Sequence, residues 1–269
     1  MANTNSQTQT NLYSYISLAL IIFSAVVLIG IQLKLVGWVI LAASFGSTFW
    51  LLPKIARDLR LIMLSLAILG LTPISTEITG WNMLNLAIML PLAVMLPHLI
   101  LRKYYADKTI KFNFDVRRKW SRPEKFYLLT GVIGAYFVLP YYFTSTGAYL
   151  NWPSINNWSE AIRLFIGTNG MGTWDEFLFV NTIMALLLRH FTYKVANLAQ
   201  AIIFTSFLFE LGFSSWGWAM IFAFALTQGA VYKRTKSIYF LLCIHLSIDF
   251  ILYLALIWSH NPSKMPVFL

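Results

Sequence analysis

The sequence predicts an all-α membrane protein, a polytopic transmembrane helix bundle of about eight to nine spans. Hydrophobic residues make up 58% of the 269-residue chain and charged residues only 11%, whereas a soluble domain has roughly 25% charged residues. The mean hydropathy is +0.68. Apolar segments long enough, or nearly so, to cross about 30 Å of hydrocarbon follow one another along the whole chain. Together these observations exclude an ordinary soluble domain.

The candidate spans are separated by short polar or basic loops. In order they cover residues 12–32, 36–52, 60–73, 83–101, 126–144, 174–189, 196–213, 216–231 and 238–258. The third and the eighth are short, so the count falls to eight if one of them is re-entrant. Pro91, Pro97 and Pro140 lie inside spans, where a neighbouring helix can satisfy the carbonyl that each proline frees.

The basic residues orient this bundle. With the N-terminus in the cytoplasm, all but Lys34, Arg163 and Lys264 of the 20 lysines and arginines lie in or beside cytoplasmic loops, as the positive-inside rule requires. The uncharged first eleven residues lack the basic region of a signal peptide, so we expect the first span to be retained. We therefore expect the net charge of +10 to interact with anionic lipid and not with nucleic acid. We expect a multi-pass protein of the plasma membrane.

Two loops divide the chain. Residues 102–125 form a basic cytoplasmic loop, which separates N-terminal spans in residues 1–125 from a C-terminal core in residues 126–269. Residues 145–172 are expected outside the cell, with residues 156–167 forming a short interfacial helix.

Acidic residues point to a site inside the membrane. Of the ten acids, Asp175, Glu176, Glu210 and Asp249 lie in predicted spans, and all of these are in the last four. His245 lies in the final span. Ionisable side chains in hydrocarbon cost several kcal/mol unless they are paired or hydrated, so their usual meaning is a functional site. The alternative is a structural polar lock between helices.

The spacing of these residues suggests their chemistry. His245 and Asp249 are four residues apart and share one face of a helix, where they can hold a metal, position a water or stabilise an oxyanion. Asp175 and Glu176 are adjacent and diverge by about 100° on a helix. Two neighbouring carboxylates in a low-dielectric site suit a general base that activates water.

Three motifs in order resemble those of a known family. Residues 175–180, Asp-Glu-Phe-Leu-Phe-Val, resemble a Glu-Glu-x-x-x-Arg motif. Residues 209–213, Phe-Glu-Leu-Gly-Phe, resemble Phe-x-x-x-His, and residues 245–249, His-Leu-Ser-Ile-Asp, resemble His-x-x-x-Asn. The order and spacing resemble the CPBP family of intramembrane proteases, which includes the type II CAAX prenyl endopeptidases and bacteriocin-immunity relatives. This resemblance implies a CPBP-like core in residues 126–269.

The resemblance also implies roles by position. Asp175 stands where the family has its water-activating glutamate, and Glu176 stands at the second, supporting glutamate. His245 and Asp249 take the positions that orient water or stabilise the oxyanion. Phe213 occupies the place of the histidine that works with the first glutamate.

The sequence departs from the family at four motif positions. Asp175 is one methylene shorter than glutamate, and Asp249 replaces an amide donor. Val180 removes the arginine, and Phe213 removes the histidine. Glu210, one turn before Phe213, could contribute a carboxylate instead.

Three functions are compatible with these features. The first is a divergent intramembrane endopeptidase, which hydrolyses membrane-embedded or membrane-adjacent peptides through a water activated by a carboxylate. The second is a non-catalytic protein of the same fold that binds a membrane partner as a regulator or immunity factor. The third is a small transporter or channel with an acidic relay. Binding of a divalent metal is left open, although one histidine with carboxylates is a poor set of ligands for zinc.

Overall fold

A computed structural model describes residues 12–263 and 267–268. Within these residues every regular element is a helix, which confirms the predicted all-α class. In chain order the elements are α1 (Leu12–Ala25), the π-helix η1 (Val26–Gly30), α2 (Lys34–Ser47), the 3₁₀ turn η2 (Thr48–Trp50), α3 (Pro53–Leu71), α4 (Gly80–Tyr104), α5 (Arg122–Thr146), the 3₁₀ turn η3 (Ala148–Asn151), α6 (Trp158–Asp175), the π-helix η4 (Glu176–Ile183), α7 (Met184–Leu187), α8 (Tyr193–Glu210), α9 (Gly217–Thr235) and α10 (Ile238–His260). Every predicted apolar segment falls on one or more of these helices.

Several helices can cross a bilayer. In the described part of the chain, Leu12–Gly30, Gly80–Tyr104, Arg122–Thr146 and Ile238–His260 are long and apolar enough, and Lys34–Trp50 is apolar but shorter. The chain is therefore an integral membrane protein. Spans beyond these four, and the orientation of the bundle, stay predictions.

The segment between α5 and η4 differs from the prediction. Residues 145–172 were expected to be an outside loop with a short helix, but α6 begins at Trp158 and continues without a break into η4 and α7. Asn157 starts the helix by accepting a hydrogen bond from the Glu160 backbone N–H at 3.0 Å, as N-cap residues do. Asp175 and Glu176 consequently lie in the middle of a long helix and not at its head.

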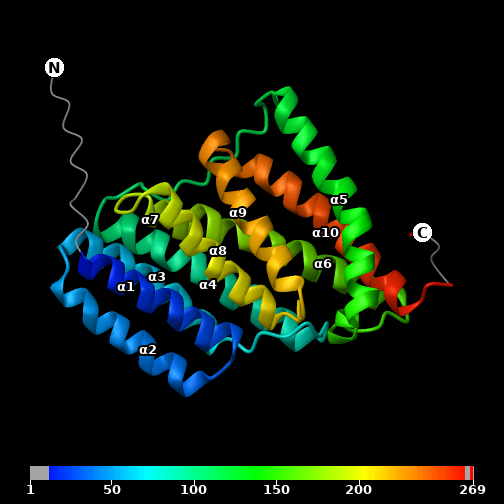
Figure 1. Cartoon of the computed structure of the whole chain (residues 1–269), viewed down its shortest axis with the longest axis horizontal. Coiled ribbons are helices and arrows are strands. Elements are labelled where there is room, and N and C mark those ends of the chain that lie inside the picture. Colours follow the sequence, from blue (N-terminus) through cyan, green and yellow to red (C-terminus); the bar gives the residue numbers. More distant parts are fainter. Residues whose placement is uncertain (1–11, 264–266, 269) are drawn as a thin grey trace.

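The helices pack in neighbouring pairs. α1 packs against α2, α3 against α4, and α8 against α9, while α10 packs against both α5 and α6. In Figure 1, α5 lies at the edge of the bundle, on the side away from α1 and α2. The π-helix η4 contacts α4, α8, α9 and α10, so its residues lie in the interior.

A proline inside α4 shows how a freed backbone group is satisfied. Pro97 lacks an N–H, so the carbonyl of Ala93, four residues earlier, loses its helical donor. The hydroxyl of Ser65 on α3 donates to this carbonyl at 2.8 Å, and Ser65 is fully buried. The expectation that a neighbouring helix compensates for the proline is confirmed at this position.

Amide side chains join α8 to α9. Gln200 donates to the side-chain oxygen of Asn197 at 2.9 Å and to the Ala225 carbonyl at 2.9 Å. Asn197 donates to the Leu226 carbonyl at 3.0 Å. A Cβ on Gly229 would lie 1.9 Å from the Asn197 side-chain oxygen, so only glycine allows this close approach.

An ion-pair network ties α3 to the loop after α4 and to the turn after α7. Arg57 lies 2.7 Å from Asp58 and 2.9 Å from Asp107. Arg189 lies 3.1 Å from Asp58 and 2.8 Å from Asp107, and His190 lies 2.8 Å from Asp58. The two arginines balance the two aspartates, so this network carries no excess charge apart from any proton on the histidine.

We expect Asp107→Asn to lower the free energy of unfolding at pH 7 by roughly 1–2 kcal/mol, because it removes charge-assisted hydrogen bonds. Burial raises the pKa of the Asp107 carboxyl, but hydrogen bonds from Thr109 and Arg189 outweigh it and lower the pKa from 3.8 to about 2. Since the folded pKa is depressed, the stabilisation is present above the unfolded value and is lost as the pH falls through about 2.

Thermal unfolding of purified protein in detergent at pH 7 and at pH 3 measures this effect. The difference between the parent and Asp107→Asn should shrink at the lower pH. Asp115→Asn is the matched control, because Asp115 is exposed in the same loop. Equal unfolding temperatures of the parent and Asp107→Asn at pH 7 would contradict the prediction.

Candidate active site

Glu176 is the centre of a buried polar cluster. Its Oε1 atom accepts a hydrogen bond from Gln228 Nε2 on α9 at 2.8 Å and lies 2.8 Å from His245 Nδ1 on α10. The exposed fractions of Glu176, Gln228 and His245 are 0%, 0% and 4%. One carboxylate oxygen thus fixes the orientation of the imidazole ring and is itself fixed by an amide.

The other ring nitrogen of His245 faces Asp249. Nε2 lies 3.7 Å from Asp249 Oδ1, too far for a direct hydrogen bond but close enough for strong electrostatic attraction. The predicted pairing of these residues on one helical face is therefore present. His245 thus lies between two carboxylates.

Asp175 completes what we call the acid–histidine cluster: Asp175, Glu176, His245 and Asp249. Asp175 is only 1% exposed and interacts electrostatically with the other three members. Among the residues that the structure describes, its Oδ1 atom, Glu176 Oε2 and Asp249 Oδ2 have no hydrogen-bond partner. Buried carboxylate oxygens are normally hydrogen-bonded, so these atoms are suited to hold water or substrate.

The local backbone explains how both adjacent acids reach one cluster. Asp175 ends α6, and Glu176 begins the π-helix η4. π-helical segments inside α-helices occur frequently at functional sites. The sequence predicted only that the two acids diverge as neighbours on an α-helix. In the structure, Asp175 lies within electrostatic range of the cluster while Glu176 binds His245.

A glycine gives the cluster its space. A Cβ atom on Gly172 would lie 1.8 Å from Asp249 Oδ2 and 3.0 Å from His245 Cδ2. Contacts this short are forbidden, so a side chain at residue 172 would displace the Asp249 carboxylate and crowd the His245 ring.

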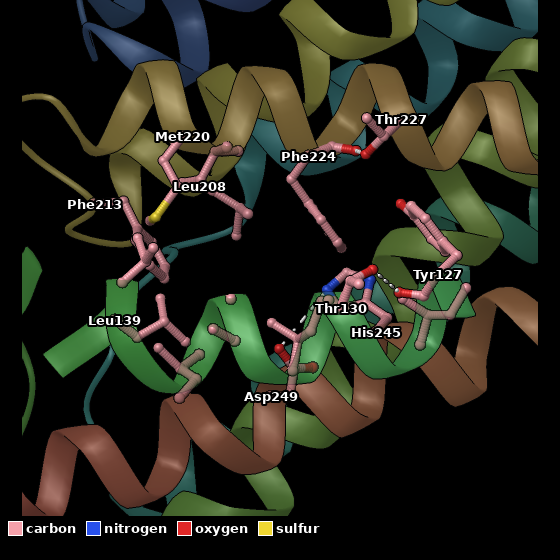
Figure 2. A pocket seen from close by; sticks show the side chains of 18 residues that line it. Tyr127, Thr130, Leu139, Leu208, Phe213, Met220, Phe224, Thr227, His245 and Asp249 are labelled. Carbon is pink, nitrogen blue, oxygen red and sulfur yellow. Dashed lines mark hydrogen bonds and ion pairs between the residues drawn. The ribbon is translucent and has the colours of Figure 1, made fainter. Parts of the chain in front are cut away.

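His245 and Asp249 line a cavity of about 360 Å³. Figure 2 shows it between α5 and α9, with Tyr127 near one end and Phe213 near the other. Thr130 on α5 and Thr227 on α9 line the cavity and are exposed, so it reaches the surface between these helices. Asp175 and Glu176 are not among its lining residues and lie behind His245 and Asp249.

Glu210 does not join the acid–histidine cluster. Its Oε1 atom accepts a hydrogen bond from Gln32 at 2.6 Å and lies 3.9 Å from Lys34 Nζ. Gln32 lies in the turn between η1 and α2, and Lys34 is the first residue of α2. The expectation that Glu210 supplies a carboxylate beside the other acids is thus at odds with its position, because the end of α8 turns it toward the N-terminal helices.

The two lost motif residues are replaced by well-packed apolar side chains. Val180 is completely buried within η4. Phe213 lies against Tyr142, Phe143 and Trp152, with ring centroids 6.2, 6.1 and 5.9 Å away. Neither position can supply a proton carrier or a cation.

Two residues of the site were not predicted from the sequence. Gln228 was not selected, although an amide inside an apolar span is a signal of interhelical hydrogen bonding. Gly172 gave no signal, because nothing local distinguishes a glycine needed for close packing from any other.

In the described part of the chain, no group of three or more histidine, cysteine or acidic side chains has the geometry to hold a metal ion.

Comparison with known proteins finds a similar family for part of the chain. Residues 157–251 match the family model of the type II CAAX prenyl endopeptidase Rce1-like proteins. No curated protein and no solved structure matches the chain. The matched range contains the whole acid–histidine cluster. The predicted resemblance to the CPBP family is confirmed over this range.

Proposed function

We propose, from the Rce1-like character of residues 157–251, that the protein is a divergent intramembrane endopeptidase. The observation that carries the proposal is the arrangement around His245. Glu176 binds one nitrogen of its ring, and Asp249 faces the other. The ring lies in the wall of a cavity that opens between two helices. Its substrate is a membrane-embedded or membrane-adjacent peptide, and the plasma membrane is the expected location.

Each member of the acid–histidine cluster has a separate role. Asp175 makes no hydrogen bond within the described residues, so it is free to accept the proton of a water that attacks the peptide carbonyl. In its protonated form, His245 stabilises the oxyanion and donates a proton to the leaving amine. Glu176 and Gln228 position the ring, and Asp249 holds the water from the cavity side.

The cavity supports entry of the substrate from the membrane plane. Apart from a few polar groups, it is lined by apolar side chains of α5, α9 and α10, such as Leu139, Phe224 and Ile248. These side chains can accept the apolar residues of a spanning peptide without the cost of desolvating polar groups.

Proteolysis of membrane-tethered peptides by purified, detergent-solubilised protein tests this function. We expect cleavage by the parent and a loss of about 10²–10⁴-fold in Asp175→Asn, because that change removes the general base. The same variant should be as heat-stable as the parent or more so, since it removes a buried carboxylate without a hydrogen bond. Asp115→Asn, in an exposed loop, should cleave as the parent does.

The second candidate function is binding of a membrane partner without catalysis. The apolar packing of Val180 and Phe213, where the family motifs have arginine and histidine, favours it. No cleavage of any peptide by a stable parent protein would sink the peptidase proposal and favour this alternative. Co-purification with a membrane partner would then be the next measurement.

A further inference from the structure

A second cavity, which is polar, lies at the end of the bundle that carries the ion-pair network. It has a volume of about 720 Å³ and is bounded by the loop after α4, by α7 and the turn after it, and by the end of α9. The lining residues are Asp107, Lys108, Thr109, Lys111, Phe112, Asn113, Ala185, Leu188, Arg189, Tyr232 and Lys236. None belongs to the acid–histidine cluster.

The charges around this cavity do not balance. Asp107 and Arg189 are neutralised within the ion-pair network. Lys108, Lys111 and Lys236 are exposed and make no ion pair with any residue that the structure describes. The cavity therefore holds an excess of three positive charges.

Polar groups hold the walls of the cavity in place. The Asn113 side chain donates to the Lys236 carbonyl at 3.2 Å, which joins the loop to the end of α9. The Tyr232 hydroxyl donates to Asn181 of η4 at 2.8 Å. Thr109 donates to Asp107 through its backbone and its hydroxyl. The three lysines are thus presented by an ordered frame.

The backbone of Lys236 adds a second observation. This residue ends α9 with φ +52°, in the left-handed region, where glycine is usual and other residues are strained. Its Nζ atom lies 5.8 Å from the centre of the Tyr232 ring, which is on the cavity wall. A strained lysine at a position suited to glycine is consistent with a role for its charge.

We propose that this cavity binds the phosphate of an anionic phospholipid headgroup. It lies where the predicted spans 83–101 and 216–231 end, at the level of the headgroups. Basic pockets between helices are typical binding sites for such lipids. The volume suits a headgroup, and the apolar side chains of Phe112 and Leu188 can contact the start of its acyl chains.

Native mass spectrometry of the full chain tests the proposal. Purified protein is titrated with phosphatidylglycerol, with phosphatidylcholine of equal chain length, and with inorganic phosphate as a competitor. We expect selective retention of phosphatidylglycerol, weakened about five-fold by the loss of each cavity lysine. Lys236→Gly is the decisive variant, because glycine relieves the strained φ and so removes the charge while keeping or raising the unfolding temperature.

Lys119→Ala is the matched control, since it removes one charge from the same basic loop at a residue outside the cavity. Unchanged lipid retention in Lys119→Ala and weakened retention in Lys236→Gly would support the site. Displacement of lipid by millimolar phosphate would assign the same site to free phosphate. Equal retention of both lipids, or equal loss in both variants, would overturn the proposal. The outcome is independent of peptidase activity.

Discussion

Glu176→Ala is expected to destabilise the protein by about 3–5 kcal/mol, because it removes one partner of a buried ion pair. The change leaves His245 Nδ1 and Gln228 Nε2 without their acceptor in a fully buried region. Thermal unfolding in detergent, followed by tryptophan fluorescence, measures the loss.

A double-mutant cycle with His245→Leu separates this interaction from general damage. If the pair is formed as described, the double variant should lose less stability than the sum of the two single variants. Additive losses would mean that Glu176 and His245 do not interact. Asp175→Asn should show no comparable destabilisation, since Asp175 makes no hydrogen bond to any described residue.

Gly172→Ala is expected to abolish most of the proposed peptidase activity. Its Cβ would meet Asp249 Oδ2 at 1.8 Å, so the carboxylate must move, and a displacement of about 1 Å in a catalytic site can cost 10²-fold in rate. Overpacking should also cost roughly 1–3 kcal/mol. The preference of alanine for helices offsets about 1 kcal/mol of this loss.

Gly170→Ala is a close control for this experiment. It lies on the same helix, and a Cβ atom there meets nothing within 4 Å. We expect it to raise the free energy of unfolding by about 0.5–1 kcal/mol, because alanine loses less backbone entropy than glycine, and to leave cleavage unchanged. Similar activity in the two variants would show that the approach of α6 to Asp249 does not matter for function.

The sequence predicted most of the helices. Apolar length and composition are local properties, and they located most of the longer helices to within a few residues. The exceptions are α3, which begins at Pro53, well before the predicted span 60–73, and the N-terminal part of the α6–α7 helix. The i, i+4 spacing of His245 and Asp249 is equally local, and these residues do meet. The rule that ionisable side chains in spans mark a site also selected Asp175 and Glu176.

The contacts between helices could not be predicted from the sequence. Glu210 met the same rule as the other acids, but its partners are Gln32 and Lys34, 178 and 176 positions away. The place of Gln228 beside Glu176, 52 positions earlier, depends on how α9 packs against η4. Such pairings could not be inferred from spacing within one segment.

Composition and periodicity by themselves therefore determined that this chain is an all-α membrane protein with acids and a histidine in its last spans. Only the tertiary structure decided that four of these residues meet beside one cavity, two in its wall and two behind it, while Glu210 does not join them. The physical reason is that hydrophobic length specifies a helix through short-range backbone hydrogen bonds. Which faces of two helices touch depends instead on small residues such as Gly172 and on polar partners far apart in the chain.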